Sequence, residues 1–579
     1  MREYLKEHTN PPVFLGAAGL TLAFLLYGVI APAQLGTAAN GTLSFISDKF
    51  GWLYLFSATG FLIAVLVLMA SRLGRIKLGP NDSTPEYSNL SWFAMLFTAG
   101  MGIGLVYYAV AEPVTHFTGP PTGQGGTPEA AENAMVYTFY HWGFHPWAIY
   151  ILLATALGYF SYRRGLPLRP ASALYSLLGD KIYGWQGALV DLIAVFGTIF
   201  GLATSLGLGA QQVGSGLNTL FGMPNNTFVQ VVIIAAITSI AVVSIMLGID
   251  KGVRNLSLLN LWLAFGLMVL VFVVSSSLGI VDSLASNVGN YISALPGLSL
   301  ETFPNSQSGQ EWQDAWTLFY WGWWISWSPF VGMFLARISY GRTIRNFVGG
   351  ALFLPVGASA VWLTVFGDSA LNRLLDNPNN PVAQSADDPA NGIFLLLEQL
   401  PLPGFLVTAA SVLTVVVVVL FFATSSDSGS LVVDILTNGG DPNPKWQQRL
   451  FWAVTEGAVA AILLVAGALA FPDDPAAALS ALQAASIAAG LPLCLVLIVM
   501  GVGLYKSLLG EDMSSPKIVE PEPLAGLREY ARMSAGPKAE QGDLTDKQIR
   551  EAQKRFAKEE EQRTRGGSSR EPAPAKKKK

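Results

Sequence analysis

The sequence predicts an all-α polytopic membrane protein with about twelve transmembrane helices. Of its 579 residues 51% are hydrophobic and only 13% are charged, whereas soluble domains carry about 25% charged residues. The mean hydropathy is +0.44, and many windows reach the roughly 20 apolar residues that cross a bilayer. The formal net charge of −4 identifies no partner, and we expect none among nucleic acids.

The predicted spans follow one another with short polar breaks. The first apolar run follows a short polar head and indicates a first span rather than a cleavable signal peptide. The single cysteine, Cys494, lies in a span, which excludes an intrachain disulfide and a cysteine-built metal site. The spans cover about residues 13–31, 52–71, 91–111, 138–160, 186–213, 227–248, 257–279, 313–336, 346–366, 403–432, 451–471 and 478–505.

Lysine and arginine fall in alternate loops, with Lys49 and Arg373 as exceptions. Such residues concentrate on the cytoplasmic side of membrane proteins. The pattern therefore places both termini in the cytoplasm, and we expect a multi-pass protein of a bacterial inner membrane. The loops assigned to the cytoplasm carry Arg2 and Lys6; Arg72, Arg75 and Lys77; Arg163, Arg164, Arg169 and Lys181; Lys251 and Arg254; Arg337, Arg342 and Arg345; and Lys445 and Arg449.

The third and eighth spans both contain helix-breaking residues, and they lie five spans apart. In secondary transporters such interrupted helices occupy matching positions of two inverted repeats and meet at a midplane site. We therefore expect two five-helix repeats of opposite orientation. The expected units are a cytoplasmic head (1–12), two N-terminal spans (13–90), a first repeat (91–280), an outer amphipathic helix (281–312), a second repeat (313–508) and a charged cytoplasmic tail (509–579).

An amphipathic helix is predicted between the seventh and eighth spans. Its apolar residues are spaced by 3 and 4, and Pro296-Gly is expected to end it. It serves either as an interfacial linker or as a subunit contact. The residues of its apolar face are Val281, Leu284, Val288, Tyr291 and Leu295.

The tail after Lys506 changes in composition. A capping box at Thr545–Gln548 precedes a charged helix with a thin apolar stripe, and the chain ends in Lys576–Lys579. The tail is either merely solvated or binds anionic lipids at the inner membrane surface.

The eighth span carries an unusual cluster of indoles at Trp321, Trp323, Trp324 and Trp327. Tryptophans of transmembrane helices usually lie at the two interfaces rather than in mid-span. A mid-membrane cluster indicates a lined cavity, and aromatic cages bind quaternary ammonium groups. The fourth span adds the aromatic side chains of Trp142, Trp147 and Tyr150, which by themselves also fit an interfacial belt.

Glycines at positions 100, 102 and 104 interrupt the third span. Gly100 and Gly104 fit helix packing, but Gly102 does not share their face. The alternative is an unwound stretch whose backbone meets a ligand, which a membrane tolerates only around a cavity. His141 and His145 share a helix face, but without a third ligand nearby they are expected to be hydrogen-bonded rather than to bind a metal.

The tenth span ends in a hydroxyl-rich segment, Thr424–Ser430, after an aliphatic run. Hydroxyl and carbonyl oxygens are the hard ligands that Na⁺ needs, while hydrogen bonding between helices is the alternative. These signals together have the form of a secondary transporter.

The chain resembles the betaine/choline/carnitine transporter family over about residues 10–510. The resemblance is carried by Trp321–Phe330, by Gly341–Arg345, and by the motifs Gly-Met-Gly-Ile-Gly at 100–104 and His-Trp-Gly-Phe-His-Pro-Trp at 141–147. It implies a leucine-transporter-like fold of two five-helix repeats with two extra N-terminal helices, and a homotrimer.

The resemblance also implies site residues. The ammonium group is expected among Trp142, Trp147, Tyr150 and Trp324, with Trp323, Trp327 and Phe334 on the cytoplasmic exit path. The stretch Gly100, Met101, Gly102 and Gly104 is expected at the ligand carboxylate. Choline and carnitine carriers tend to carry aspartate at the last glycine, so Gly104 favours a zwitterion such as glycine betaine.

The same resemblance implies Na⁺ as the coupling ion and no other cofactor. One ion is expected at the carbonyls of Thr98, Met101 and Phe421 and the hydroxyls of Thr424 and Ser425. A second involves Thr198 and Phe330, although Leu202 stands where another hydroxyl is expected.

The sequence therefore predicts a Na⁺-coupled importer of glycine betaine or a related compatible solute for osmoprotection, and not an enzyme. Ectoine, proline or choline are alternative substrates. Two other classes are a membrane hydrolase using Ser425 or Ser426 with His141 or His145, which lacks a Gly-x-Ser-x-Gly turn, and a sensor or channel without coupled transport.

Overall fold

The computed structural model describes residues 8–100, 102–247, 250–441, 445–474 and 477–511, with the backbone alone described at 97–100, 247 and 250–256. Within these ranges the structure is helical, and its sole β feature is an isolated antiparallel bridge between Lys77 and Thr343. The predicted all-α class is confirmed. The predicted tail helix lies outside the described residues.

The described helices of the first half range in length from the 4 residues of α8 to the 39 residues of α3. They are α2 (Pro11–Ile30), α3 (Pro32–Ala70), α4 (Asn89–Gly100), α5 (Ile103–Thr118), α6 (Pro128–Trp142), α7 (Phe144–Gly158), α8 (Tyr175–Leu178), α9 (Trp185–Phe221), α10 (Thr227–Leu247), α11 (Asp250–Val274) and α12 (Ser277–Leu298).

The second half contains the indole-rich helix and four further long helices. Its helices are α13 (Gln307–Gln313), α14 (Phe319–Ile338), α15 (Ile344–Leu363), α16 (Ser369–Asp376), α17 (Gly392–Glu398), α18 (Gly404–Thr437), α19 (Trp446–Ala470) and α20 (Ala477–Leu509). Short π-helical turns η2 (Tyr159–Arg163), η5 (Asp314–Leu318) and η6 (Thr364–Asp368) extend α7, α13 and α15.

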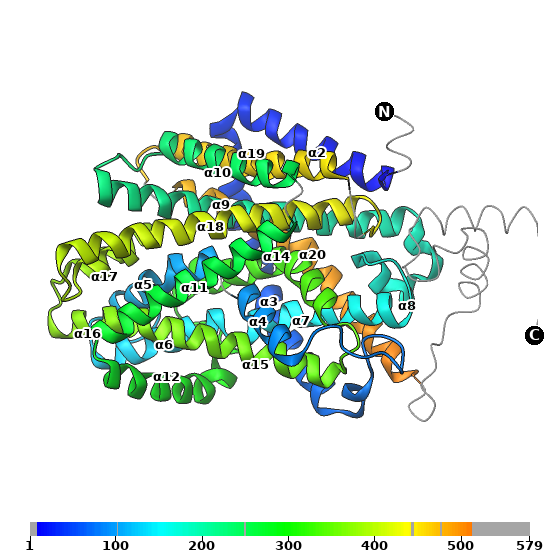
Figure 1. Cartoon of the computed structure of the whole chain (residues 1–579), viewed down its shortest axis with the longest axis horizontal. Coiled ribbons are helices and arrows are strands. Elements are labelled where there is room, and N and C mark those ends of the chain that lie inside the picture. Colours follow the sequence, from blue (N-terminus) through cyan, green and yellow to red (C-terminus); the bar gives the residue numbers. More distant parts are fainter. Residues whose placement is uncertain (1–7, 101, 248–249, 442–444, 475–476, 512–579) are drawn as a thin grey trace, which may run out of the picture.

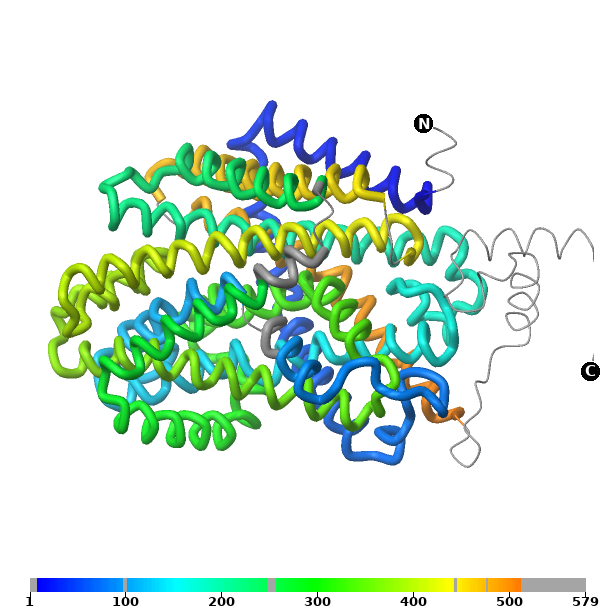
Figure 2. Tube along the Cα trace, viewed as in Figure 1, coloured from blue at the N-terminus to red at the C-terminus, as the bar shows by residue number. Residues whose placement is uncertain are grey.

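The long helices pack side by side around a small group of central helices (Figures 1 and 2). α9 packs against α18, α20 and α14, and α14 packs against α7 and α20, so α14 lies at the centre. Toward one side α2, α10 and α19 form an outer layer, while α12 lies along the opposite side (Figure 1). Residues far apart in sequence are thereby brought to the face of α14.

Ten helices among the described residues are long and apolar enough to cross a membrane. They correspond to ten of the predicted spans. The third span differs because it divides into α4 and α5, with Gly102 in an extended conformation (φ −146°, ψ 178°). The eighth differs because α14 is rich in aromatic rather than aliphatic residues. The break in the third span agrees with the unwound alternative rather than with packing alone.

The prediction that the eighth span is also interrupted is wrong, because α14 runs unbroken through Pro329. Proline lacks the N–H that would satisfy the carbonyl one turn earlier. Here the Ser328 hydroxyl donates to that carbonyl, Ile325 O, at 2.7 Å. A neighbouring hydroxyl thus replaces the lost backbone hydrogen bond, as transmembrane helices allow.

The amphipathic helix is present as α12 and continues two residues beyond Pro296, to Leu298. Tyr291 is buried, and its hydroxyl accepts a 3.0 Å hydrogen bond from the backbone N–H of Phe144. Asn287 donates to Asp368 at 2.7 Å. α12 is therefore fixed to α7 and η6 within one chain, whatever else it contacts.

Two arginines assigned to a cytoplasmic loop are buried ion-pair partners. Arg163 pairs with Glu511 at 2.7 Å, and Arg169 pairs with Asp191 at 2.6 Å. Glu511 also accepts from Tyr159 at 2.6 Å. All four paired side chains are buried, so these two loop charges are neutralised by carboxylates rather than by solvent.

The signature Gly341–Arg345 closes the turn between α14 and α15. Gly341 has φ +77°, and its N–H donates to Leu78 O at 2.8 Å. Thr343 caps α15 by accepting from Asn346 N, and Arg345 donates to Met69 O at 2.8 Å at the end of α3. This motif therefore joins three segments and does not line the central cavity.

Candidate functional site

A small cavity lies where the break between α4 and α5 faces α7 and α14. Half of its lining residues are aromatic, and none of the described lining residues is charged. The wall is made of Gly102, Gly104, Leu105, Trp142, Pro146, Trp147, Tyr150, Trp323, Trp324, Trp327, Val331 and Ser359. The structure thus brings together the predicted substrate residues of three separate spans.

The rings of the cavity meet at steep angles. Trp142 and Trp324 lie 5.0 Å apart at 69°, and Trp147 and Tyr150 lie 5.8 Å apart at 90°. Tyr150 and Trp324 are 6.4 Å apart at 80°. Rings set at such angles present several π faces toward one volume, which is the arrangement that attracts a cation without hydrogen bonds.

Two of the indoles of α14, Trp323 and Trp324, are held by backbone acceptors on neighbouring helices. Trp324 Nε1 donates to His141 O at 3.0 Å, and Trp323 Nε1 donates to Gly201 O at 3.2 Å. Trp323 and Trp324 stack at 4.4 Å. These bonds use the indole N–H groups of Trp323 and Trp324, so both residues present ring faces and edges to the cavity.

The structure does not separate the predicted exit-path residues from the predicted box. Trp323 and Trp327 line the same cavity as Trp324, whereas Phe334, about two turns beyond Trp327 on α14, is not among its lining residues. The exit-path assignment stays a prediction for Phe334. Trp321 is not among the lining residues of the cavity. Its ring stacks on His145 with a centroid distance of 5.4 Å, which fits a packing role.

Gly104 allows the rings to approach the backbone of α5. A Cβ atom at this position would lie 2.4 Å from Trp323 Cη2 and 3.0 Å from Trp142 Cη2. Gly102 is also in the wall, and a Cβ atom added there would lie 3.7 Å from Trp327 Cη2. The side chain of Gly100 has no description and Met101 lies outside the described residues, so their predicted role stays untested.

The first predicted Na⁺ site is only partly within the described structure. Thr424 donates to Leu420 O at 2.8 Å and to Phe421 O at 3.2 Å, so these groups are bonded within α18. Ser425 is half-buried on the same helix. Met101 and the side chain of Thr98 are not described, and the prediction of this site remains open.

The second predicted site lies where α9 packs against α14. Thr198 is buried and donates to Ala194 O at 2.9 Å, and Phe330 stacks on Trp327 at 5.6 Å. Leu202 is buried against Gly429. Thr204 bonds instead to Ser486 at 2.7 Å, so it does not supply the missing hydroxyl.

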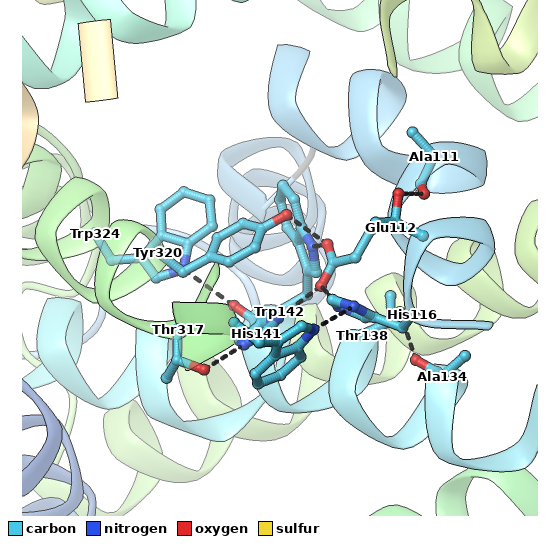
Figure 3. Close-up of polar contacts among 12 residues, drawn as sticks. Ala111, Glu112, His116, Ala134, Thr138, His141, Trp142, Thr317, Tyr320 and Trp324 are labelled. Carbon is cyan, nitrogen blue, oxygen red and sulfur yellow. Dashed lines mark hydrogen bonds and ion pairs between the residues drawn. The ribbon is translucent and has the colours of Figure 1, made fainter. Parts of the chain in front are cut away.

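A buried polar cluster adjoins the cavity and was missed at the sequence level (Figure 3). Glu112 lies on α5, inside the helix rather than in the loop where hydropathy placed it. Its Oε2 accepts from Trp142 Nε1 at 2.8 Å and from the Tyr320 hydroxyl. Its Oε1 lies 2.7 Å from His141 Nδ1 and 3.4 Å from His116 Nε2. The available signal was an ionisable pair, Glu112 and His116, one helical turn apart beside an apolar span.

One ligand atom each of Glu112, His116 and His141 lie within 4.8 Å of one another, as a metal site would require. However, Trp312 Nε1 donates to His116 Nδ1 at 3.2 Å. An indole nitrogen only donates, so the proton of neutral His116 is on Nε2, facing Glu112. Metal ligation through Nε2 would need that proton removed, so the cluster fits hydrogen bonding better. His145 bonds separately to Ser299 at 3.2 Å.

Fold and site together define a multi-pass membrane transporter with an aromatic-lined central site. The model of the BCCT, betaine/carnitine/choline family transporter, matches residues 12–513. The chain belongs to this family of transporters, and is therefore not an enzyme.

Three relatives illustrate the similarity. The chain is 43% identical over 500 residues to a "Glycine betaine transporter" of Acinetobacter baylyi, covering 86% of this chain and 73% of the relative. It is 42% identical over 512 residues to the "Osmo-dependent choline transporter BetT2" of the same organism, covering 88% and 72%. It is 40% identical over 501 residues to a "Probable glycine betaine transporter" of Desulfitobacterium hafniense, covering 86% and 97%.

Proposed function

We propose that the chain is a Na⁺-coupled symporter that imports glycine betaine or a related quaternary-ammonium compatible solute for osmoprotection. The observation that carries the proposal is the cavity whose wall combines Trp142, Trp147, Tyr150 and Trp324 with the broken backbone at Gly102. Cation–π attraction contributes roughly 0.5–2 kcal/mol per well-placed ring. The first N–H groups of a helix lack partners within that helix and attract anions, so the start of α5 at Ile103 suits a carboxylate.

A zwitterion is favoured over choline by the crowding at Gly104. Any side chain there would meet Trp323 and Trp142, so this position supplies no carboxylate to a cationic substrate. Choline is the second candidate, because one relative is named a choline transporter. Ectoine and proline remain weaker candidates, since neither carries a trimethylammonium group.

The proposed coupling to Na⁺ depends on the hydroxyl-rich segment of α18 at Thr424 and Ser425. The proposal of a second Na⁺ depends on Thr198. We further propose an inner-membrane location with cytoplasmic termini, a homotrimer, the predicted inverted repeats and domain limits, and contact of the tail with anionic lipids.

Uptake of radiolabelled glycine betaine into proteoliposomes tests the proposal. An inward Na⁺ gradient should drive accumulation above the external concentration, and choline, ectoine and proline should compete in decreasing order of cation–π attraction. Uptake unchanged after Na⁺ is replaced by K⁺ would refute the coupling. Equilibration without accumulation would indicate a channel or sensor instead.

A further inference from the structure

In the Glu112 cluster, the hydrogen-bond partners decide which atom carries the proton in most of the hydrogen bonds. Trp142 Nε1 and Trp312 Nε1 are donors only, so Glu112 Oε2 and His116 Nδ1 must accept. His116 then carries its proton on Nε2 and donates to Glu112 Oε1. The side chains of Glu112, His116 and His141 are fully buried, so no open water satisfies them.

One position in the cluster is not fixed. His141 Nδ1 lies 2.7 Å from Glu112 Oε1, and His141 Nε2 lies 2.9 Å from the Thr317 hydroxyl. A hydroxyl both donates and accepts. When His141 carries one proton, on Nδ1, Thr317 donates to Nε2 and the cluster has a charge of −1. When a second proton binds, Nε2–H donates to Thr317 and the cluster is neutral.

We propose that Glu112, His141 and Thr317 form a binding site for one exchangeable proton, and that a proton there weakens the binding of a cationic quaternary ammonium in the adjacent cavity. The proton comes from water and forms one N–H bond at His141 Nε2. Thr317 changes from donor to acceptor, and no heavy atom moves. The other proton can lie on His141 Nδ1 or on Glu112 Oε1. In either case the total charge of Glu112 and His141 is zero.

Trp142 joins this site to the cavity. Its Nε1 donates to Glu112, while its ring forms part of the cavity wall (Figure 3). A carboxylate on the indole N–H makes the ring face more electron-rich and adds a negative charge behind it. Charge interactions are poorly screened away from water, so a cation in the cavity gains more from the charged state than a zwitterion does.

Other titratable groups that face the cluster do not supply the same change. The tyrosines keep their protons throughout the neutral and acidic range. His145 contacts Thr59 and Ser299 rather than Glu112, and Asp314 interacts with Asp48 instead. The neighbouring groups are Tyr108 and His116 of α5, Tyr137 and Tyr140 of α6, His145 of α7, and Tyr320 of α14.

The first experiment uses the full-length protein in nanodiscs without substrate. A second proton on the Glu112–His141 unit removes the negative charge behind Trp142, so tryptophan fluorescence is expected to change through one transition as the pH is lowered. Glu112→Gln and Thr317→Val should abolish or displace this transition, and Thr317→Ser should retain it. His145→Gln is the matched buried-imidazole control and should titrate like the wild type. A transition that is absent from the wild type, or that Thr317→Val leaves in place, would overturn the proton site.

The second experiment rests on the proposed function, since it uses choline and glycine betaine as probes. As the pH is lowered from about 8 through this transition, the Kd of choline is expected to rise about five- to tenfold, and that of glycine betaine by less than about twofold. Calorimetric titration of choline in buffers of different ionisation enthalpy should show proton release. Equal pH dependence of both probes would contradict the linkage. Failure of both to bind, with the fluorescence transition intact, would refute the proposed function alone.

Discussion

At the scale of single residues, the site depends on how closely rings approach one another and the backbone. No charged side chain is among the described residues of the cavity wall, so the proposed selectivity for a quaternary ammonium would rely on π faces and on Glu112 behind Trp142. Trp324 occupies the central position, because it contacts Trp142, Tyr150 and Trp327.

Replacing Trp324 by leucine should raise the Kd of glycine betaine about 2- to 30-fold, since one well-placed ring contributes about 0.5–2 kcal/mol. Equilibrium binding of the labelled substrate to purified protein measures this. Trp262→Leu is the matched control, because its indole is 68% exposed on the outer surface of α11. A wild-type Kd for Trp324→Leu would remove this residue from the site.

Replacing Gly104 by alanine should weaken binding at least about fivefold, because overpacking of a filled site costs about 1–3 kcal/mol. The new methyl group would meet Trp323 at 2.4 Å and Trp142 at 3.0 Å. Gly60→Ala provides the control, since nothing lies within 4 Å of its added Cβ. Comparable losses in the two variants would show that crowding of the rings is irrelevant.

At the scale of elements, the turn between α14 and α15 fixes how the indole-rich helix sits. Gly341 has φ +77° and donates to Leu78, while Arg342 lies 3.9 Å above the Trp92 ring. The turn therefore links α14 to α4 and to the segment after α3. The motif Gly341–Arg345 therefore shapes the turn between α14 and α15, although it also carries the resemblance to the family.

Gly341→Ala should lower the thermal unfolding midpoint of the detergent-solubilised protein. A left-handed conformation costs a residue with a Cβ about 1–2 kcal/mol, and the added atom would lie 2.3 Å from Thr84 O. Gly357→Ala in α15 has nothing within 4 Å and should leave the midpoint near the wild-type value. An unchanged midpoint for Gly341→Ala would contradict the assigned turn.

At the scale of the whole molecule, the cavity and the predicted ion positions lie on helices that pack together. α9 contacts both α14 and α18, and α5 contacts α9. If two ligands favour the same arrangement of helices, each must raise the affinity for the other by the same factor.

If Na⁺ and glycine betaine stabilise one conformation, Na⁺ should lower the Kd of betaine about 5- to 100-fold, and betaine should lower the Kd of Na⁺ by the same factor. Binding measured in Na⁺ and in K⁺ at constant ionic strength tests both directions. Thr424→Ala combined with Ser425→Ala should remove the effect. Equal affinity in the two salts would show that these hydroxyls do not couple an ion to the substrate.

The sequence by itself determined the class, most span positions and most of the cavity wall. Hydropathy locates helices because a bilayer requires long apolar segments whose backbone is satisfied internally. Tryptophans in mid-span, such as Trp323 and Trp324, and the glycines at 102 and 104 stood out because they are unfavourable against lipid.

Only the tertiary structure decided contacts between distant segments. Glu112 appeared to begin a loop, and its partners His141 and Tyr320 come from two other helices. Arg163, which the sequence assigns only to a cytoplasmic loop, pairs with Glu511. Pro329 predicted a break that the Ser328 hydroxyl prevents. Hydrogen bonds and ion pairs depend on positions in space within about 3 Å, and neither hydropathy nor spacing along one helix encodes which distant groups reach that distance.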